Sequence, residues 1–187
     1  MSRGYLVLDI ETVPDPELYT PPDQPSGTEK AFPPLYAHRP IVLGVLWLDE
    51  LFAFKRIGVI GEHDDEPGML SDFSTFVEQW RPHIVTFNGR SFDLPVIMLR
   101  CLRHGVPLHF FFNDKDYRYR YTDAGHIDLY DFLSEHGAAR VGALDRDSYR
   151  RVAQGLYDAL AADGRVQPVL ERVDKKRLLL EPPATTG

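Results

Sequence analysis

The order of apolar segments in the sequence predicts an α/β fold, in which helices flank a mixed central sheet. Three apolar runs typical of strands come first, at residues 5–10, 41–48 and 51–60. Strand and helix patterns then alternate through residues 71–104, and such alternation adds parallel strands to a sheet. The 187 residues suit one domain, so we expect a single domain over residues 1–187.

Loop and helix patterns separate these strands. A proline-rich stretch, residues 14–40, predicts a long surface loop. Residues 61–68 are acidic, end in Pro-Gly and predict a second loop. Ser71 or Asp72 is then expected to cap a helix, whose apolar side chains recur at helical spacing until Pro82 ends it.

The next part of the chain repeats the order of strand, turn and helix. Residues 83–87 predict a strand, the Asn-Gly pair that follows predicts a turn, and the residues from Phe92 to Gly105 predict a helix. Much later, residues 147–163 carry apolar side chains in helical phase, which predicts an amphipathic helix.

Composition and charge limit the class of protein. The formal net charge of −7 argues against bulk electrostatic attraction to nucleic acid, but it is compatible with an acidic site that recruits metal ions. The single cysteine, Cys101, excludes an internal disulfide, and its apolar surroundings predict a buried thiol. We expect a cytoplasmic protein without a membrane partner, because the sequence has neither a membrane-spanning apolar run nor a signal-peptide pattern.

Two carboxylates lie at the end of the first predicted strand. In the sequence LVLDIET, residues 6–12, Asp9 and Glu11 are two positions apart, so on a strand both side chains point to one face. Such a pair is unfavourable unless a cation compensates for it, and hard oxygen ligands suit Mg²⁺ or Mn²⁺. The same pattern also fits a strand that simply ends in a polar loop.

A third carboxylate, Asp93, follows the second strand–turn–helix junction, in the sequence NGRSFD at residues 88–93. Taken alone, Asp93 fits a residue that the helix dipole favours in the first helical turn. Taken together with the pair on the first strand, it predicts three oxygen ligands that converge on one site.

These motifs resemble those of the DEDD (DnaQ-like) superfamily of 3′–5′ exonucleases. Residues 9–12 resemble the first exonuclease motif, and residues 88–93 resemble the second, in which an asparagine and an aromatic residue precede the aspartate. The alternating run YRYRY at residues 117–121, followed by HIDL at residues 126–129, is similar to the branch related to the proofreading exonuclease of family B DNA polymerases.

The resemblance covers residues 4–137 and leaves residues 138–187 as a divergent tail. It implies a ribonuclease H-like fold and hydrolysis of a phosphodiester with two Mg²⁺ or Mn²⁺ ions. By this resemblance, Asp9 bridges the two ions, while Glu11 and Asp93 hold one ion or position the attacking water.

The resemblance also implies a substrate and the residues that bind it. The substrate is the 3′ end of single-stranded DNA or RNA, and Asn88 and Phe92 shape the pocket for the terminal nucleotide. Phe92 has an alternative role in core packing. In the YRYRY run, Arg118 and Arg120 are candidates to meet phosphates while tyrosines stack on bases. The alternative is an amphipathic strand with tyrosines inward and arginines in water.

Two features leave the activity open. Asp128 is expected near the site, either as a ligand or as support for the ligands. The family pattern also requires a fourth acidic residue on a late helix, after a tyrosine or histidine at fixed spacing, and the tail has no match. Either Asp158 or Asp163 replaces it, or the helix is replaced, or the tail is an altered reading frame. We therefore expect a 3′–5′ exonuclease, with a catalytically impaired module that binds nucleic acid or protein as the alternative and a fold without a nucleic-acid role as a third.

Overall fold

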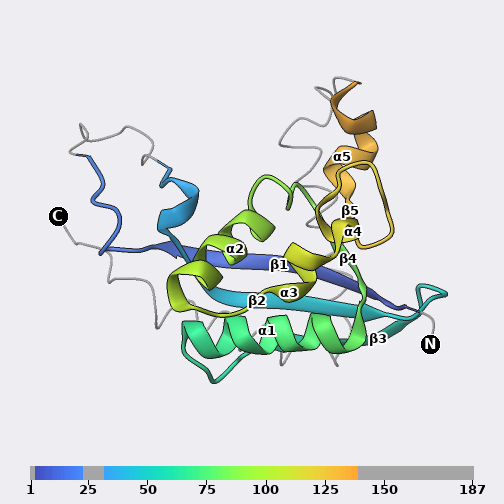
Figure 1. The fold of residues 1–187 in the computed structure, drawn as a ribbon, viewed down its shortest axis with the longest axis horizontal. Helices are drawn as coiled ribbons and strands as arrows, with labels where there is room; N and C mark the ends of the chain where they lie inside the picture. Colours follow the sequence, from blue (N-terminus) through green and yellow to red (C-terminus); the bar gives the residue numbers. More distant parts are fainter. Residues whose placement is uncertain (1–2, 23–31, 139–187) are drawn as a thin grey trace, which may run out of the picture.

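The fold is a five-stranded mixed sheet with helices, as the sequence predicts. A computed structural model describes residues 3–22 and 32–138 (Figure 1). The sheet has the strand order β3-β2-β1-β4-β5. Its strands are β1 Tyr5–Pro14, β2 His38–Leu48, β3 Phe54–Ile60, β4 His83–Thr86 and β5 His126–Asp128.

The pairing of the strands explains why the sheet is mixed. β1, β2 and β3 follow one another along the chain and pair antiparallel. β4 and β5 join the other side of β1 in parallel, after helical connections. The register between β1 and β2 shifts between Glu11 and Thr12, which places a bulge beside the predicted carboxylate pair.

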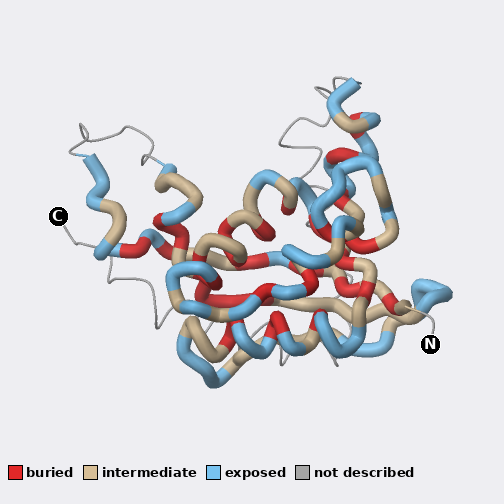
Figure 2. The backbone as a smooth tube through the Cα atoms, in the orientation of Figure 1, coloured by how far each residue is buried: buried red, intermediate tan, exposed pale blue. Residues whose placement is uncertain are grey.

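The main core lies between the sheet and a helical layer that includes α1 and α2. The helices are η1 Leu35–Ala37, α1 Glu66–Trp80, α2 Asp93–His104, α3 His109–Asn113, α4 Lys115–Arg118, α5 Leu129–Leu133 and η2 Glu135–Gly137. Figure 2 shows the buried residues concentrated where the sheet meets α1 and α2. Leu6, Leu8 and Ile10 of β1 pack there against side chains of both helices, including Phe73 and Ile97. The other face of β1 carries Val7, Asp9 and Glu11, which are exposed or half-buried.

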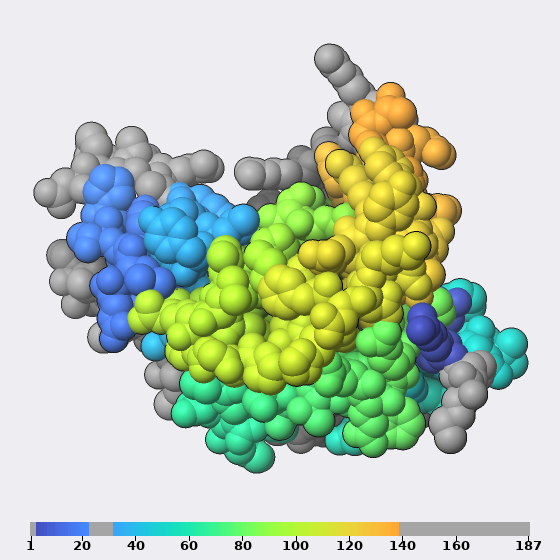
Figure 3. All heavy atoms as spheres, viewed as in Figure 1, coloured from blue at the N-terminus to red at the C-terminus, as the bar shows by residue number. Residues whose placement is uncertain are grey.

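The surface is hollowed above the start of α2. Figure 3 shows this hollow between two arms of the chain. One arm consists of residues 15–22 and η1, coloured blue, and the other of residues 115–138, coloured yellow to orange. Green atoms of the region that leads into α2 lie between the arms.

The first helix begins earlier than predicted. α1 starts at Glu66, and its cap is Asp65, whose side chain accepts a hydrogen bond from the amide of Gly68 at 3.0 Å, so the predicted caps Ser71 and Asp72 are wrong. The Pro-Gly pair suggested a loop. Proline is nevertheless compatible with the first turn of a helix, because the amide hydrogen that it lacks would have no partner there. The predicted end was confirmed, since Arg81 caps the helix in the left-handed conformation just before Pro82.

The alternating run at residues 117–121 is not a strand. The segment begins in α4, because the side chain of Asp114 caps that short helix by accepting from the amide of Asp116. Tyr117 is buried, as predicted, and its hydroxyl donates to the carbonyl of Pro82 at 2.8 Å. Tyr119 and Tyr121 are exposed, so the interpretation with all tyrosines inward is wrong for these two.

Other boundaries differ by a few residues. β1 and β2 extend beyond the predicted ranges 5–10 and 41–48. β3 begins at Phe54 instead of Leu51, because the carboxylate of Asp49 accepts hydrogen bonds from the amides of Leu51 and Ala53 and holds them in a turn.

The predicted helix at residues 147–163 lies outside the described residues. In the part of the chain that is described, no helix has the length and apolar character needed to cross a membrane.

A buried ion-pair network joins the elements that carry the site. Arg100 of α2 is 2 % exposed and donates to Asp15, which follows β1, at 2.6 Å, and to both carboxylate oxygens of Glu66 at the start of α1. Burial alone would raise the pKa of Asp15, but the hydrogen bond from Arg100 and the other favourable contacts outweigh it and lower that pKa.

We expect an Arg100→Met substitution to lower the free energy of unfolding by about 3–5 kcal/mol, because it removes the guanidinium that is hydrogen-bonded to the buried carboxylate of Asp15 and the half-buried carboxylate of Glu66. Urea unfolding at pH 7 measures this change. Lys55→Met is the matched control, since the Lys55 side chain is 52 % exposed and pairs with Asp49 away from this network. Its expected loss is below about 1 kcal/mol. Equal losses in the two variants would contradict the importance of the buried network.

Candidate active site

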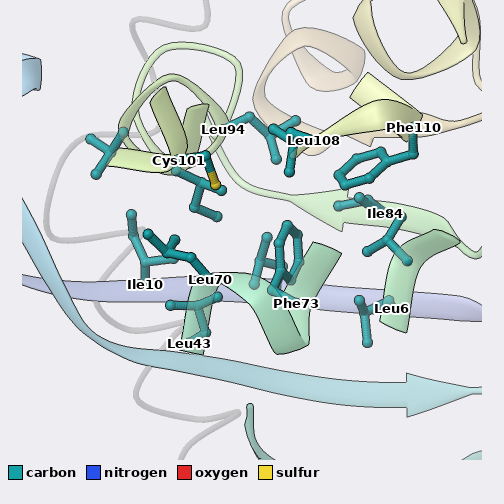
Figure 4. Packing of buried hydrophobic residues seen from close by; sticks show 14 of the residues in the cluster. Leu6, Ile10, Leu43, Leu70, Phe73, Ile84, Leu94, Cys101, Leu108 and Phe110 are labelled. Carbon is teal, nitrogen blue, oxygen red and sulfur yellow. The ribbon is translucent and has the colours of Figure 1, made fainter. Parts of the chain in front are cut away.

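Asp9 and Glu11 project together from the sheet because of the alternation along β1. Ile10, between them, points into the core, where Figure 4 shows it packed near Leu43 and Leu70. Since the side chains of a strand alternate, burial of Ile10 forces the carboxylates of Asp9 and Glu11 to the opposite face. Asp9 is exposed and Glu11 is partly exposed, so solvent and ligands can reach this pair.

Asp93 joins this pair through the main chain of β1. It is the first residue of α2, and its carboxylate accepts a hydrogen bond from the amide of Ile10 at 3.2 Å. The next residue, Leu94, points into the core and fixes the orientation of this helical turn (Figure 4). The structure therefore places Asp93 beside the segment of β1 that carries Asp9 and Glu11, since Asp93 is bonded to the residue between them.

The surroundings of Asp9 and Asp93 are unfavourable for their charged forms. Desolvation by burial, followed by the negative charge of Asp9, raises the pKa of Asp93 from 3.8 to about 7. Desolvation and the charge of Glu11 also raise the pKa of Asp9. Within residues 3–22 and 32–138, neither Asp9 nor Asp93 forms an ion pair with a basic side chain. The charges of Asp9 and Asp93 are thus not offset by a salt bridge within the described part of the chain.

The chemistry of these donors fits a divalent cation with hard character. Carboxylate oxygens are the ligands that Mg²⁺ and Mn²⁺ prefer, and a bound cation would relieve the repulsion that raises the two pKa values. The carboxylates are not drawn together into a ready-made site, because the described residues contain no group of three His, Cys, Asp or Glu side chains with metal-binding geometry. The fit lies in the type, convergence and charge of the donors.

Asp128 organises the turn that leads to Asp93. Its carboxylate accepts the amides of Asn88 at 2.8 Å, Arg90 at 2.9 Å and Tyr130 at 3.0 Å. Of the two predicted roles for Asp128, these bonds favour support of the site over direct metal binding. Asn88 is exposed, with a positive φ of 60°. Gly89 is required because a side chain there would meet Thr86, 2.4 Å from a Cβ atom.

Phe92 forms part of an aromatic wall beside the carboxylates. Its ring lies edge-on to His38, with centroids 4.9 Å apart, and it also packs against the core, so the core-packing interpretation holds in part. The ring of Phe32, which is 73 % exposed, lies 4.7 Å from that of His38. The wall therefore has a buried base and an exposed edge.

Neither His38 nor Thr12 was predicted to take part in this wall. The carbonyl of Pro33 can only accept a hydrogen bond, so Nε2 of His38 carries the proton in that 3.0 Å contact. Nδ1 of His38 then accepts from the hydroxyl of Thr12 at 2.9 Å. Burial lowers the pKa of His38, more than the bond to Pro33 raises it, which favours this neutral ring. His38 lies in the proline-rich stretch 14–40 that the sequence predicts as a loop, and only the folded chain shows that it is the first residue of β2 and meets Thr12.

The two arginines predicted to meet phosphates differ in availability. Arg118 is exposed. Arg120 makes two hydrogen bonds to the carboxylate of Asp131, at 2.9 and 2.6 Å, so it is already paired and is less available than predicted. Arg90, which the sequence did not single out, donates to the carbonyls of Arg118 and His126 at 3.3 and 2.8 Å. It ties the 118–121 segment to the turn beside the site.

A second concave region lies away from these residues. It is an apolar groove of about 500 Å³ between β2, β3 and α1, lined by residues that include Trp47, Phe76 and Trp80. None of the predicted site residues lines it. The converging carboxylates, and not the volume of this groove, therefore identify the candidate active site.

Comparison with known families identifies one match. The model of a family described as "Predicted 3'-5' exonuclease related to the exonuclease domain of PolB" matches residues 30–157. The match includes Asp93 and Asp128 and begins after β1, which carries Asp9 and Glu11. No curated protein sequence matches significantly.

Solved structures with a similar fold come from larger proteins. The chain is similar to the family B DNA polymerase from Pyrobaculum calidifontis, with a TM-score of 0.43 and 22% identity over 72% of this chain and 16% of the polymerase. It is also similar to E. coli exonuclease I in complex with a dA16 oligonucleotide, with a TM-score of 0.41 and 14% identity over 74% of this chain and 31% of the exonuclease. The chain thus spans less than a third of the length of either protein.

The raised pKa of Asp93 predicts a pH-dependent penalty in the metal-free protein. Between 3.8 and about 7, the folded chain holds a proton on Asp93 that the unfolded chain has lost, so stability falls as pH rises through this range. Asp93→Asn removes the penalty. We expect it to raise the melting temperature in EDTA by roughly 2–8 °C at pH 8 and by little at pH 4. The exposed Asp72→Asn variant is the control, and a shift of equal size at both pH values would contradict the assignment.

We also expect the Asp128 carboxylate to be required for the local structure of the turn. Asp128→Ala leaves the amides of Asn88, Arg90 and Tyr130 without their acceptor, at a cost of about 2 kcal/mol or more. Asp128→Asn keeps one acceptor oxygen and should have an intermediate effect. Amide hydrogen exchange of residues 88–91 measures the loosening. Unchanged protection of these amides in Asp128→Ala would be inconsistent with this role.

Proposed function

Since the chain belongs to the family of predicted 3′–5′ exonucleases related to the exonuclease domain of PolB, we propose that it is a metal-dependent exonuclease. It removes nucleotides from the 3′ ends of single-stranded DNA or RNA by hydrolysing the terminal phosphodiester. The observation that carries this proposal is the hydrogen bond from the amide of Ile10 to Asp93, which places this carboxylate beside the strand segment of Asp9 and Glu11.

Asp9, Glu11 and Asp93 would hold the Mg²⁺ or Mn²⁺ ions, two of them in the fully active protein. When bound, such ions supply positive charge that favours a hydroxide nucleophile and a leaving 3′ oxygen. The chain contributes the fixed positions of the carboxylates, which depend on the buried neighbours Ile10 and Leu94. The role of the ions also explains how a chain with a net charge of −7 acts on a phosphodiester.

The terminal nucleotide would lie between the turn after β4 and the aromatic wall. Asn88 is exposed on a turn that Asp128 holds in place, so its amide side chain is available to the nucleotide. Phe92 is braced by His38 and offers an apolar surface to a base or sugar. Arg118 is available for a phosphate, whereas Arg120 would first have to leave Asp131.

One observation favours the second candidate function, a catalytically impaired module that binds nucleic acid or a protein partner. The family pattern requires four carboxylates, of which the described residues offer Asp9, Glu11 and Asp93 as candidates, and Asp128 is engaged by three main-chain amides. The two candidate replacements, Asp158 and Asp163, lie outside the described residues. With one ligand missing, hydrolysis falls steeply, because groups that act as a unit lose activity in a non-additive way.

A nuclease assay tests the main proposal. We expect the purified chain to shorten 5′-labelled single-stranded DNA or RNA from the 3′ end in Mn²⁺ or Mg²⁺, and to lose this activity in EDTA. Asp9→Asn should lower the rate by roughly two orders of magnitude or more, because it removes a ligand charge while keeping the shape of the side chain. Asp72→Asn, an exposed substitution on α1, should leave the rate unchanged.

The outcomes separate the two candidate functions. No degradation by the wild-type chain in either metal, with binding of the strand retained, would replace the exonuclease by the binding module. Degradation that survives Asp9→Asn would contradict the assigned site. In an active protein, Asp158→Asn and Asp163→Asn, tested one at a time, identify which tail residue completes the ligand set.

A further inference from the structure

We propose that Tyr119 and Tyr121, together with Arg118, form a stacking platform for the single strand that leads into the site. This inference rests on the proposed function and names where the nucleotides preceding the terminal one would lie. Tyr119 is 57 % exposed and Tyr121 is 65 % exposed, although Tyr117 of the same run is fully buried. Their rings lie 5.8 Å apart at an angle of 69° and present aromatic surface to solvent.

The exposure of Tyr119 and Tyr121 needs an explanation, because the sequence of this segment is also compatible with a strand. Its alternating pattern suits a strand, which would have turned all three tyrosines to one side. The chain instead buries only Tyr117, whose ring packs against Phe110 at 5.1 Å. The backbone then leaves α4 and directs the next two aromatic side chains outward. Single exposed apolar residues are common, but two neighbouring rings beside a candidate active site suggest a binding surface.

The platform is fixed in place before any ligand binds. Tyr117 anchors one end through its hydrogen bond to Pro82, and the bidentate pair of Arg120 with Asp131 holds the middle. The chain also approaches itself closely at Gly125, where a Cβ atom would lie 2.7 Å from the main chain of Asp116. A surface held in this way loses little conformational entropy on binding, so its stacking energy is retained as affinity.

The platform is continuous with the proposed active site. Arg90, in the turn between Asn88 and Asp93, donates to the carbonyls of both Arg118 and Tyr119, at 3.3 and 3.4 Å. The same turn is held by Asp128. In the space-filling view, the yellow segment that contains the platform borders the hollow above the start of α2 (Figure 3). A strand whose 3′ end reaches the carboxylates can therefore continue across the tyrosines.

The charges of this arm favour stacking over phosphate contacts as the source of affinity. Arg120 pairs with Asp131, and Arg90 lies 3.5 Å from the same carboxylate, so two of the three arginines are engaged by one internal acid and are less available to phosphates. Only Arg118 of this group is exposed without such a pair in the described part of the chain. Bases of any sequence stack on aromatic rings, so we infer binding of single strands with little sequence preference and weak salt dependence.

Binding of fluorescein-labelled oligonucleotides, followed by anisotropy in the Asp9→Asn background with EDTA, tests the platform. For a ten-nucleotide dT strand, we expect the double variant Tyr119→Ala/Tyr121→Ala to bind about tenfold or more weakly, and Tyr119→Phe/Tyr121→Phe to bind normally. A dinucleotide should show no such difference, because it does not reach the platform. Phe52→Ala, which removes a 65 % exposed ring from the turn between β2 and β3, is the matched control.

Three results would overturn the platform. They are unchanged affinity of the double Ala variant for the long strand, an equal loss for the dinucleotide, and a loss in the double Phe variant. A steep salt dependence abolished by Arg118→Ala would also overturn it, since phosphate contacts would then carry the binding. Cleavage is scored separately in the Asp9 wild-type background. If the double Ala variant loses affinity only for the long strand and no protein cleaves, the platform is supported and the exonuclease is rejected. If the protein cleaves but the double Ala variant binds the long strand as tightly as the protein with both tyrosines, the exonuclease is supported and the platform is rejected.

Discussion

The hydrogen bond from the amide of Ile10 to the carboxylate of Asp93 is the contact on which the arrangement of the site depends. It joins residues 83 positions apart and sets the first turn of α2 against the middle of β1. The bond also draws a buried carboxylate toward two others, against their mutual repulsion. Such an arrangement persists only because the core on the other face of β1 and the clamp of Arg100 hold the two elements together.

A second level of organisation keeps the turn and the 118–121 segment in fixed positions beside that contact. Asp128 binds the turn through three amides, while Arg90 reaches from the turn to the carbonyls of the neighbouring segment. The polar groups of Asp128 and Arg90, which look like candidates for ligand binding, are therefore engaged in hydrogen bonds within the protein. Their internal bonds leave the side chains of Asn88, Arg118, Tyr119 and Tyr121 directed to solvent.

The strands and the carboxylate pair could be predicted because they follow from local patterns. An apolar run of alternating burial defines β1, and the spacing of Asp9 and Glu11 places both on one face regardless of the rest of the fold. The start of α1 and the path of residues 117–121 could not be predicted in the same way. There, local caps at Asp65 and Asp114 outweigh the pattern of apolar residues. His38 and Thr12 meet only through pairing of β1 with β2, which no local pattern encodes.

The site carries a conflict between stability and binding. Desolvation and neighbouring charge raise the pKa of both Asp9 and Asp93, so the folded, metal-free chain is less stable at neutral pH than it would be with neutral side chains there. A divalent cation of the kind we propose would offset this repulsion, and it would stabilise the folded chain because it would bind the folded arrangement and not the unfolded chain. The buried Arg100 network helps to keep the fold intact while the carboxylates remain mutually repelling.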